Sequence, residues 1–138
     1  MRNISALSLG LLIVGLGLFG AAAVTPSAFP GAFSADGATT HAVALFVMLS
    51  ITEVFTMFGG WVVARIVTDH RIGHAITMAT LGLAAAVFVG AIRWAVAPPW
   101  YYVTSWVLMP VAAAIGAAAW ERSLRRRGVD TGRLSAAA

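Results

Sequence analysis

The chain has 138 residues, of which 60% are hydrophobic and only 10% are charged, and it contains no cysteine. A typical soluble domain carries about 25% charged residues, and one core of this size cannot enclose so much apolar surface. The composition therefore indicates an integral membrane protein. The lack of cysteine excludes disulfides, thiolate metal sites and the thiol chemistry of quinone-linked oxidoreductases.

The charge is strongly basic, with nine basic residues, five acids and a net charge of +4. A sequence pI of about 11.2 is compatible with nucleic-acid binding. Long stretches with almost no charge separate the basic residues, however, and this spacing is typical of membrane topology. We therefore expect no nucleic-acid partner. All nine basic residues are arginine, which we interpret as the bias of a GC-rich bacterial genome.

Four apolar runs are long enough to cross a bilayer, which takes about 20 residues as a helix. In lipid, a continuous apolar run must satisfy its backbone groups internally, so helix is expected in each. The sequence predicts an all-α, four-transmembrane-helix bundle in a single domain, residues 1–128. Gly128 is expected to end the last helix, so that 129–138 forms a disordered cytoplasmic tail. The predicted helices are 4–23, 42–66, 73–95 and 102–120.

The first run also resembles a secretory signal, since Arg2 precedes it and three small residues, 21–23, follow its apolar part. The apolar run from Ile4 is nevertheless long enough to span a bilayer. We therefore expect an uncleaved first helix.

The positions of the arginines predict the orientation of the helices. Eight of the nine precede the first helix, flank the short 68–72 turn or follow the fourth helix, and only Arg93 lies near an opposite loop. Because cytoplasmic loops are enriched in arginine, both termini are predicted to be cytoplasmic. The predicted location is a bacterial inner membrane, crossed several times. The short turn also predicts that helices 42–66 and 73–95 form the tightest antiparallel pair.

Small residues recur at every fourth position of the second helix, at Thr52, Thr56, Gly60 and Ala64. Such faces let helix backbones approach closely in lipid. Packing within one bundle accounts for the pattern, and so does contact with a second copy or a subunit of a larger complex. The motif leaves these possibilities open.

A set of short motifs recurs between residues 59 and 116. They resemble a loose group of small bacterial four-helix membrane proteins that share a Gly-Gly-aromatic helix end, a basic turn, a His-Ala start and a Pro-x-Trp-Tyr loop. The resemblance implies the fold and no particular activity. This chain departs from the pattern by Asp69-His70 in the turn and by two consecutive prolines. The motif residues are Gly59, Gly60, Trp61, Ala64, Arg65, His74, Ala75, Pro99, Trp100, Tyr101 and Pro110.

Glu53 and Arg93 are the two charges within the predicted spans that do not lie at a cytoplasmic helix end. Glu53 lies about 15 Å from either helix end, where the neutral form of a carboxyl is favoured. It is interpreted either as an acid that donates a hydrogen bond to a neighbouring helix, or as a proton or cation site. Arg93 lies roughly 10 Å nearer the outside, and either extends to the lipid head groups or pairs with Glu53.

The remaining polar residues predict no catalytic or cofactor site. His41 lies at the opposite end of the bundle from His70 and His74, so the histidines cannot share a haem. His70 and His74 have the spacing of a metal pair only if His70 is helical, and we interpret both as interfacial polar residues. The arginines of the tail are expected to contact anionic lipid head groups; they are Arg122, Arg125, Arg126 and Arg127.

Two functions from different classes are the main interpretations, and an unrecognised lipid-handling enzyme stays open beside them. The first is a non-enzymatic accessory or scaffolding subunit of a bacterial inner-membrane assembly, with membrane lipids and other subunits as partners and no cofactor. The alternative is a small oligomeric proton-coupled transporter or channel that uses Glu53. Small multidrug exporters also have four helices and one membrane acid, but that acid lies in their first helix.

Overall fold

Each apolar run forms one long helix in the computed structural model, which describes residues 2–92 and 94–136. The described residues are all-helical apart from turns and contain no strand. Each of the four helices is long and apolar enough to cross a membrane. The helices are α1 (Arg2–Ala28), α2 (Ala42–Ile66), α3 (Arg71–Ile92) and α4 (Pro99–Ala136).

Local chemistry explains where the helices begin. α4 begins at Pro99, three residues earlier than predicted, because the fixed φ of proline suits the first helical position. α2 is capped by His41, whose Nδ1 accepts a hydrogen bond of 3.3 Å from the Ala44 N–H. Thr40 is the capping residue that side-chain chemistry favours, but it lies one position too far from the helix.

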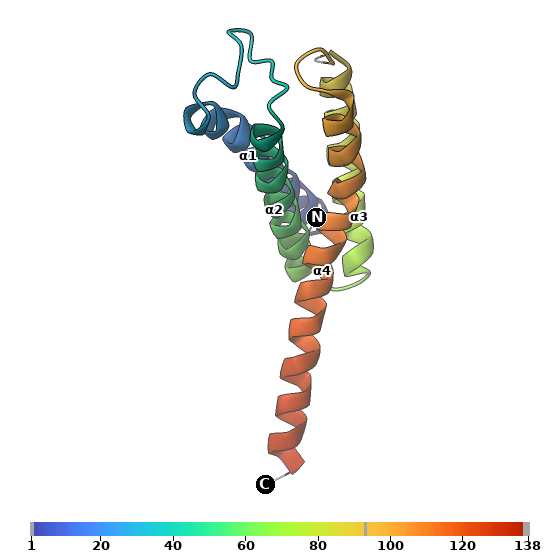
Figure 1. The fold of residues 1–138 in the computed structure, drawn as a ribbon. Coiled ribbons are helices and arrows are strands. Elements are labelled where there is room, and N and C mark those ends of the chain that lie inside the picture. Colours follow the sequence, from blue (N-terminus) through green and yellow to red (C-terminus); the bar gives the residue numbers. More distant parts are fainter. Residues whose placement is uncertain (1, 93, 137–138) are drawn as a thin grey trace.

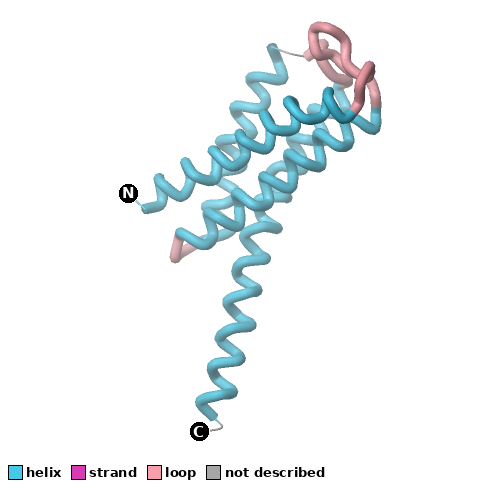
Figure 2. Tube along the Cα trace, turned by 90° about the vertical axis from the view of Figure 1, so that its left-hand side faces the viewer, coloured by secondary structure: helices cyan, strands magenta, loops and turns pink. Residues whose placement is uncertain are grey.

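The connections between the helices lie at the two opposite ends of the bundle (Figures 1 and 2). The turn of residues 67–70 joins α2 to α3 at one end, and the loops of residues 29–41 and 94–98 lie at the other. Ala6 packs in one cluster with Val67 and Ala75, so α1 begins at the end of the bundle where the short turn lies. We call this the inner end and the opposite one the outer end.

α2 is the central helix, and it packs more extensively against α1 and α4 than against α3. The prediction that α2 and α3 form the tightest pair is therefore wrong. A short turn makes two helices antiparallel neighbours, but small residues decide how closely they approach along their length. Gly59 faces the Gly10 backbone of α1, and Gly60 faces the Ala113 backbone of α4.

α2 and α4 run parallel. The ring of Phe46 lies 5.6 Å from that of Trp100 near the start of both helices, and Trp61 lies 5.4 Å from Trp120 further along both. Between these ring pairs the two backbones meet at glycines. A Cβ added to Gly116 would overlap the carbonyl oxygen of α2 that belongs to Met57.

The core is built mainly from small side chains, while large apolar side chains point outward. Phe19 and Phe88 are 75% and 68% exposed. An arrangement of this kind places apolar surface against lipid and lets small residues mediate the helix contacts. The main buried cluster comprises Ala6, Val14, Val63, Ala64, Val67, Ala75, Met78, Ala79, Met109, Ala113 and Ala117.

The last helix does not end at Gly128, the position that the sequence predicts. α4 continues through Gly128 to Ala136, and its last turns project beyond the other three helices (Figure 1). Gly128 and Gly132 each cost a helix only about 1 kcal/mol, and the arginines and leucines around them favour helix. Residues 137 and 138 lie outside the described residues.

Candidate functional site

Glu53 places a carboxyl group inside the bundle. Both carboxyl oxygens are buried, and neither has a hydrogen-bond partner among the described residues. The residue as a whole is half-buried, so the carboxyl is covered while part of the stem reaches the surface. An unpartnered polar group in an apolar setting costs free energy, so Glu53 is a local departure from stable packing.

The hydroxyl groups beside Glu53 on α2 donate within their own helix. Thr52 donates to the Met48 carbonyl and Thr56 to the Thr52 carbonyl, each at 2.9 Å. Ser50 donates in the same way to Phe46 at 2.8 Å. Their protons are therefore engaged, and none is directed to the Glu53 carboxyl.

α4 brings a phenol toward this acid. The hydroxyl of Tyr101 lies within electrostatic range of the Glu53 carboxyl. The parallel packing of α2 and α4 accounts for this proximity, since it places the first turns of α4 beside the outer half of α2. Residues separated by about 50 positions in the sequence thus share one seam, whose described titratable groups include the Glu53 carboxyl and the phenols of Tyr101 and Tyr102.

Aromatic rings cover the outer end of this seam. Trp94 stacks on Tyr102 with centroids 5.3 Å apart and an interplanar angle of 14°, and Tyr101 meets Tyr102 edge to face at 5.7 Å. Trp106 and Trp100 extend the cluster along α4. Aromatic residues gather in this way at the level of lipid head groups. The second predicted charge, Arg93, lies outside the described residues.

The predicted small-residue stripe of α2 is buried along its whole length; its members are Thr52, Thr56, Gly60 and Ala64. Gly60 lies against the backbone of α4, where a Cβ would come within 2.8 Å of the Ala113 Cα. The stripe is therefore occupied by a helix of the same chain.

A basic and aromatic cluster lies at the inner end. The guanidinium carbon of Arg65 lies 5.4 Å from the ring centroid of Trp61 and 5.7 Å from that of Trp120. The predicted head-group residues Arg122, Arg125 and Arg126 are exposed, whereas the side chain of Arg127 is not described. This cluster was not predicted from the sequence, although Trp61 and Arg65 have the i, i+4 spacing of helix neighbours.

His70 and His74 do not lie on one helical turn, which is the arrangement that a metal pair at this spacing requires. His70 lies in the turn before α3 with a φ of 47°, and His74 places its Nδ1 3.1 Å from the His70 carbonyl oxygen. Within the described part of the chain, no three His, Asp or Glu side chains are grouped in a way that suits a metal ion.

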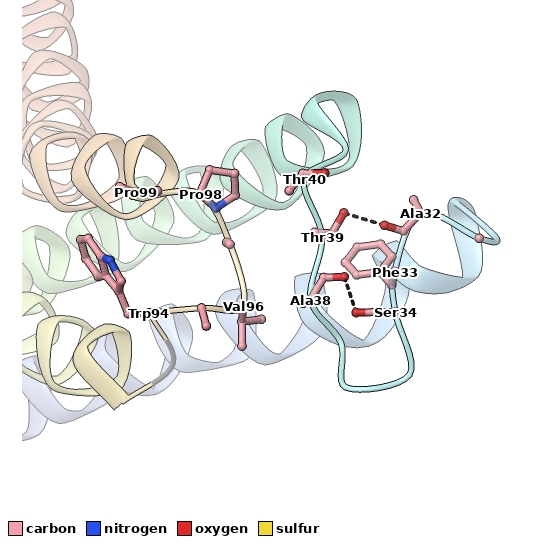
Figure 3. A pocket seen from close by; sticks show the side chains of 13 residues that line it. Ala32, Phe33, Ser34, Ala38, Thr39, Thr40, Trp94, Val96, Pro98 and Pro99 are labelled. Atoms are coloured by element: carbon pink, nitrogen blue, oxygen red, sulfur yellow. Dashed lines mark hydrogen bonds between the residues drawn. The ribbon is translucent and has the colours of Figure 1, made fainter.

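A depression of about 740 Å³ lies between the two outer loops (Figure 3). Thr39 joins the loops by donating its N–H to the Val96 carbonyl at 2.9 Å. Two hydroxyls of the wall are already engaged: that of Thr39 donates to the Ala32 carbonyl at 2.6 Å, and that of Ser34 lies 2.9 Å from the Ala38 carbonyl, which it faces in Figure 3. Hydrogen bonds from Ser34 and the Ala38 N–H lower the pKa of the exposed Asp36 carboxyl.

Comparisons of the chain with models of known protein families, with curated proteins and with solved structures found no match.

Proposed function

We propose that the protein is a non-enzymatic accessory or scaffolding subunit of a bacterial inner-membrane assembly, inserted by four helices with both termini in the cytoplasm. The observation that carries this proposal is an apolar groove of about 510 Å³ between α3 and α4. Its surface is almost wholly carbon, and it faces outward from the bundle.

The chemistry of the groove suits a transmembrane helix. Pro110, Ala114 and Ala118 follow one another at every fourth position of α4 and give one wall small side chains. Ile72 and Ile76 of α3 form the facing wall. Small residues at this spacing let a neighbouring helix approach closely, and in lipid such packing is a main source of helix association. A further helix seated here would extend the packing that already joins α2 to α4.

The proposed orientation predicts the result of reporter fusions. A reporter that is active only outside the cytoplasm should be silent when fused after Ala138 and active when inserted near Asp36, because arginine-rich segments stay in the cytoplasm. Enzyme activity in intact cells measures the outcome, and immunoblotting controls for expression. Activity of the Ala138 fusion, or silence of the Asp36 fusion, would reverse the topology.

The groove predicts a site-specific cross-link. A photoreactive amino acid at Ile115, which is 49% exposed on the rim, should give a discrete protein adduct in membranes. The matched control is Phe19, which is 75% exposed on α1 and should label only lipid. Ala114→Leu should lower the yield at position 115, because the added side chain fills the groove.

The mass of the adduct identifies the occupant. A product of twice the 14.3 kDa chain mass means that a second copy lies in the groove, and any other discrete mass means a different subunit. A scaffolding role is contradicted if position 115 labels only lipid, as the control does.

A second candidate function, an oligomeric proton-coupled transporter or channel, rests on the Glu53 carboxyl. Its two oxygens are buried without a partner among the described residues, and the Tyr101 phenol is near. An acid in this setting is able to bind and release a proton when the seam between α2 and α4 opens. Proton-linked flux by the purified protein in proteoliposomes tests this function.

A further inference from the structure

Arg65 lies in the last turn of α2, where the negative end of the helix dipole stabilises a cation. Two tryptophans fix its position, since the guanidinium lies within 6 Å of the Trp61 and Trp120 ring centroids. These rings meet edge to face at 84° and come from different helices, so the cation is placed by the fold of the bundle.

The hydrogen-bonding groups of Arg65 remain available. Its side chain is exposed and donates to no other described residue. In contrast, the Nε–H of Arg71, at the same end of the bundle, donates a hydrogen bond of 3.1 Å to the Val67 carbonyl. A guanidinium offers five N–H donors in a planar fork that matches two oxygens of a phosphate. The Trp120 Nε1 is buried and has no acceptor among the described residues, so it leaves the guanidinium as the accessible donor of this cluster.

The surroundings of Arg65 favour an anion. Among the side chains described at the inner end, five arginines stand against two acids, Asp69 and Glu121. Tryptophans are characteristic of the boundary between hydrocarbon and head groups, so the ring pair indicates the depth of lipid phosphates. The five arginines are Arg65, Arg71, Arg122, Arg125 and Arg126.

We propose that Arg65, held between Trp61 and Trp120, is a specific binding site for the phosphate of an anionic phospholipid. The lipid head group bonds to the guanidinium fork, and the acyl chains lie along the apolar surface of α2 and α4 toward Phe58, which stacks 5.7 Å from Trp61. This site differs from the diffuse attraction of the tail arginines because one side chain has a fixed orientation. It requires the helices to lie in a bilayer, but no partner subunit.

The test measures binding of phosphatidylglycerol to the full chain in a neutral detergent, by native mass spectrometry and by the shift in unfolding temperature. One lipid should remain bound, and phosphatidylcholine should compete poorly. Arg65→Gln should weaken the affinity about tenfold, as expected for a hydrogen bond between charged groups. Arg65→Lys, which keeps the charge and loses the fork, should show part of that loss.

The control is the same pair of substitutions at Arg126, which is exposed on α4 and has no ring contact with a described residue. Arg126→Lys should leave the affinity unchanged, which separates a formed site from general attraction. Trp120→Leu should weaken binding through Arg65 without changing the charge. Circular dichroism establishes that each variant is folded before binding is compared.

Three results would overturn the site. If a folded Arg65→Gln or Arg65→Lys variant binds the lipid with wild-type affinity, the guanidinium fork of Arg65 is not needed for binding. Equal losses from the substitutions at positions 65 and 126 leave only diffuse electrostatics. Equal stabilisation by inorganic phosphate means that the site takes a free anion and no lipid.

Discussion

Gly116→Ala is expected to separate α4 from α2 and to lower the free energy of unfolding by about 3 kcal/mol, the upper range for overpacking of a core. The new methyl group would overlap the Met57 carbonyl oxygen and lie 3.0 Å from the Trp61 backbone nitrogen. Both obstacles are backbone atoms of α2, which cannot rotate away as a flexible side chain can. Unfolding in mixed detergent micelles measures the effect, and Gly60→Ala should act similarly against Ala113.

The matched controls are Gly15→Ala and Gly20→Ala in α1, where an added Cβ meets nothing within 4 Å. These variants should keep or increase stability, since alanine is favoured over glycine in a helix by about 1 kcal/mol. The close contact between α2 and α4 would be refuted if alanine at position 116 were as harmless as alanine at position 15.

Glu53→Met is expected to raise the free energy of unfolding by about 1–3 kcal/mol, the cost of an unsatisfied buried polar group. Methionine has similar length and fills the seam without two oxygens that lack partners. Glu53→Gln keeps a polar end and should stay near wild type. Unfolding in mixed micelles gives the stability, and proteoliposomes give the proton-linked flux.

The same variants distinguish the two functions. If Glu53 carries protons, wild type shows flux and both variants lose it, because neither side chain can release a proton. If the protein is an accessory subunit, all three forms lack flux and differ only in stability. A Met variant that is less stable than wild type would contradict the unpartnered carboxyl and indicate an ionised acid paired with a cation.

The number and positions of the helices follow from the sequence because span length is fixed by the bilayer. The end of α1 does not, since it continues past the predicted residue 23 to Ala28 and includes Pro26. Proline here removes one donor and leaves the helix otherwise intact, with the Thr25 hydroxyl bonding to the Ala21 carbonyl at 2.7 Å. Local propensity alone does not show whether such a proline ends a helix.

The partners of each helix are harder to predict. The spacing of Gly60 marks a close approach, but it does not specify α4 as the neighbour. For the same reason, Glu53 is recognisable as an acid in a span, while Tyr101 and the orientation of the carboxyl depend on parallel packing of helices far apart in sequence. The Arg65 cluster likewise needs Trp120 from α4.

The position of α2 between α1 and α4 has a consequence for biogenesis. If the helices insert in chain order, as the proposed function requires, α1 and α2 would enter the bilayer long before α4 is made, and the glycine face of α2 at Gly60 would stay open to lipid until α4 emerges. Glu53 and Arg65 would also lack their neighbours from α4 until then, since α4 supplies Tyr101 beside Glu53 and Trp120 beside Arg65. A ribosome that stalls before Pro99 would therefore leave an acid exposed in hydrocarbon, a feature by which membrane quality control can recognise the unfinished product.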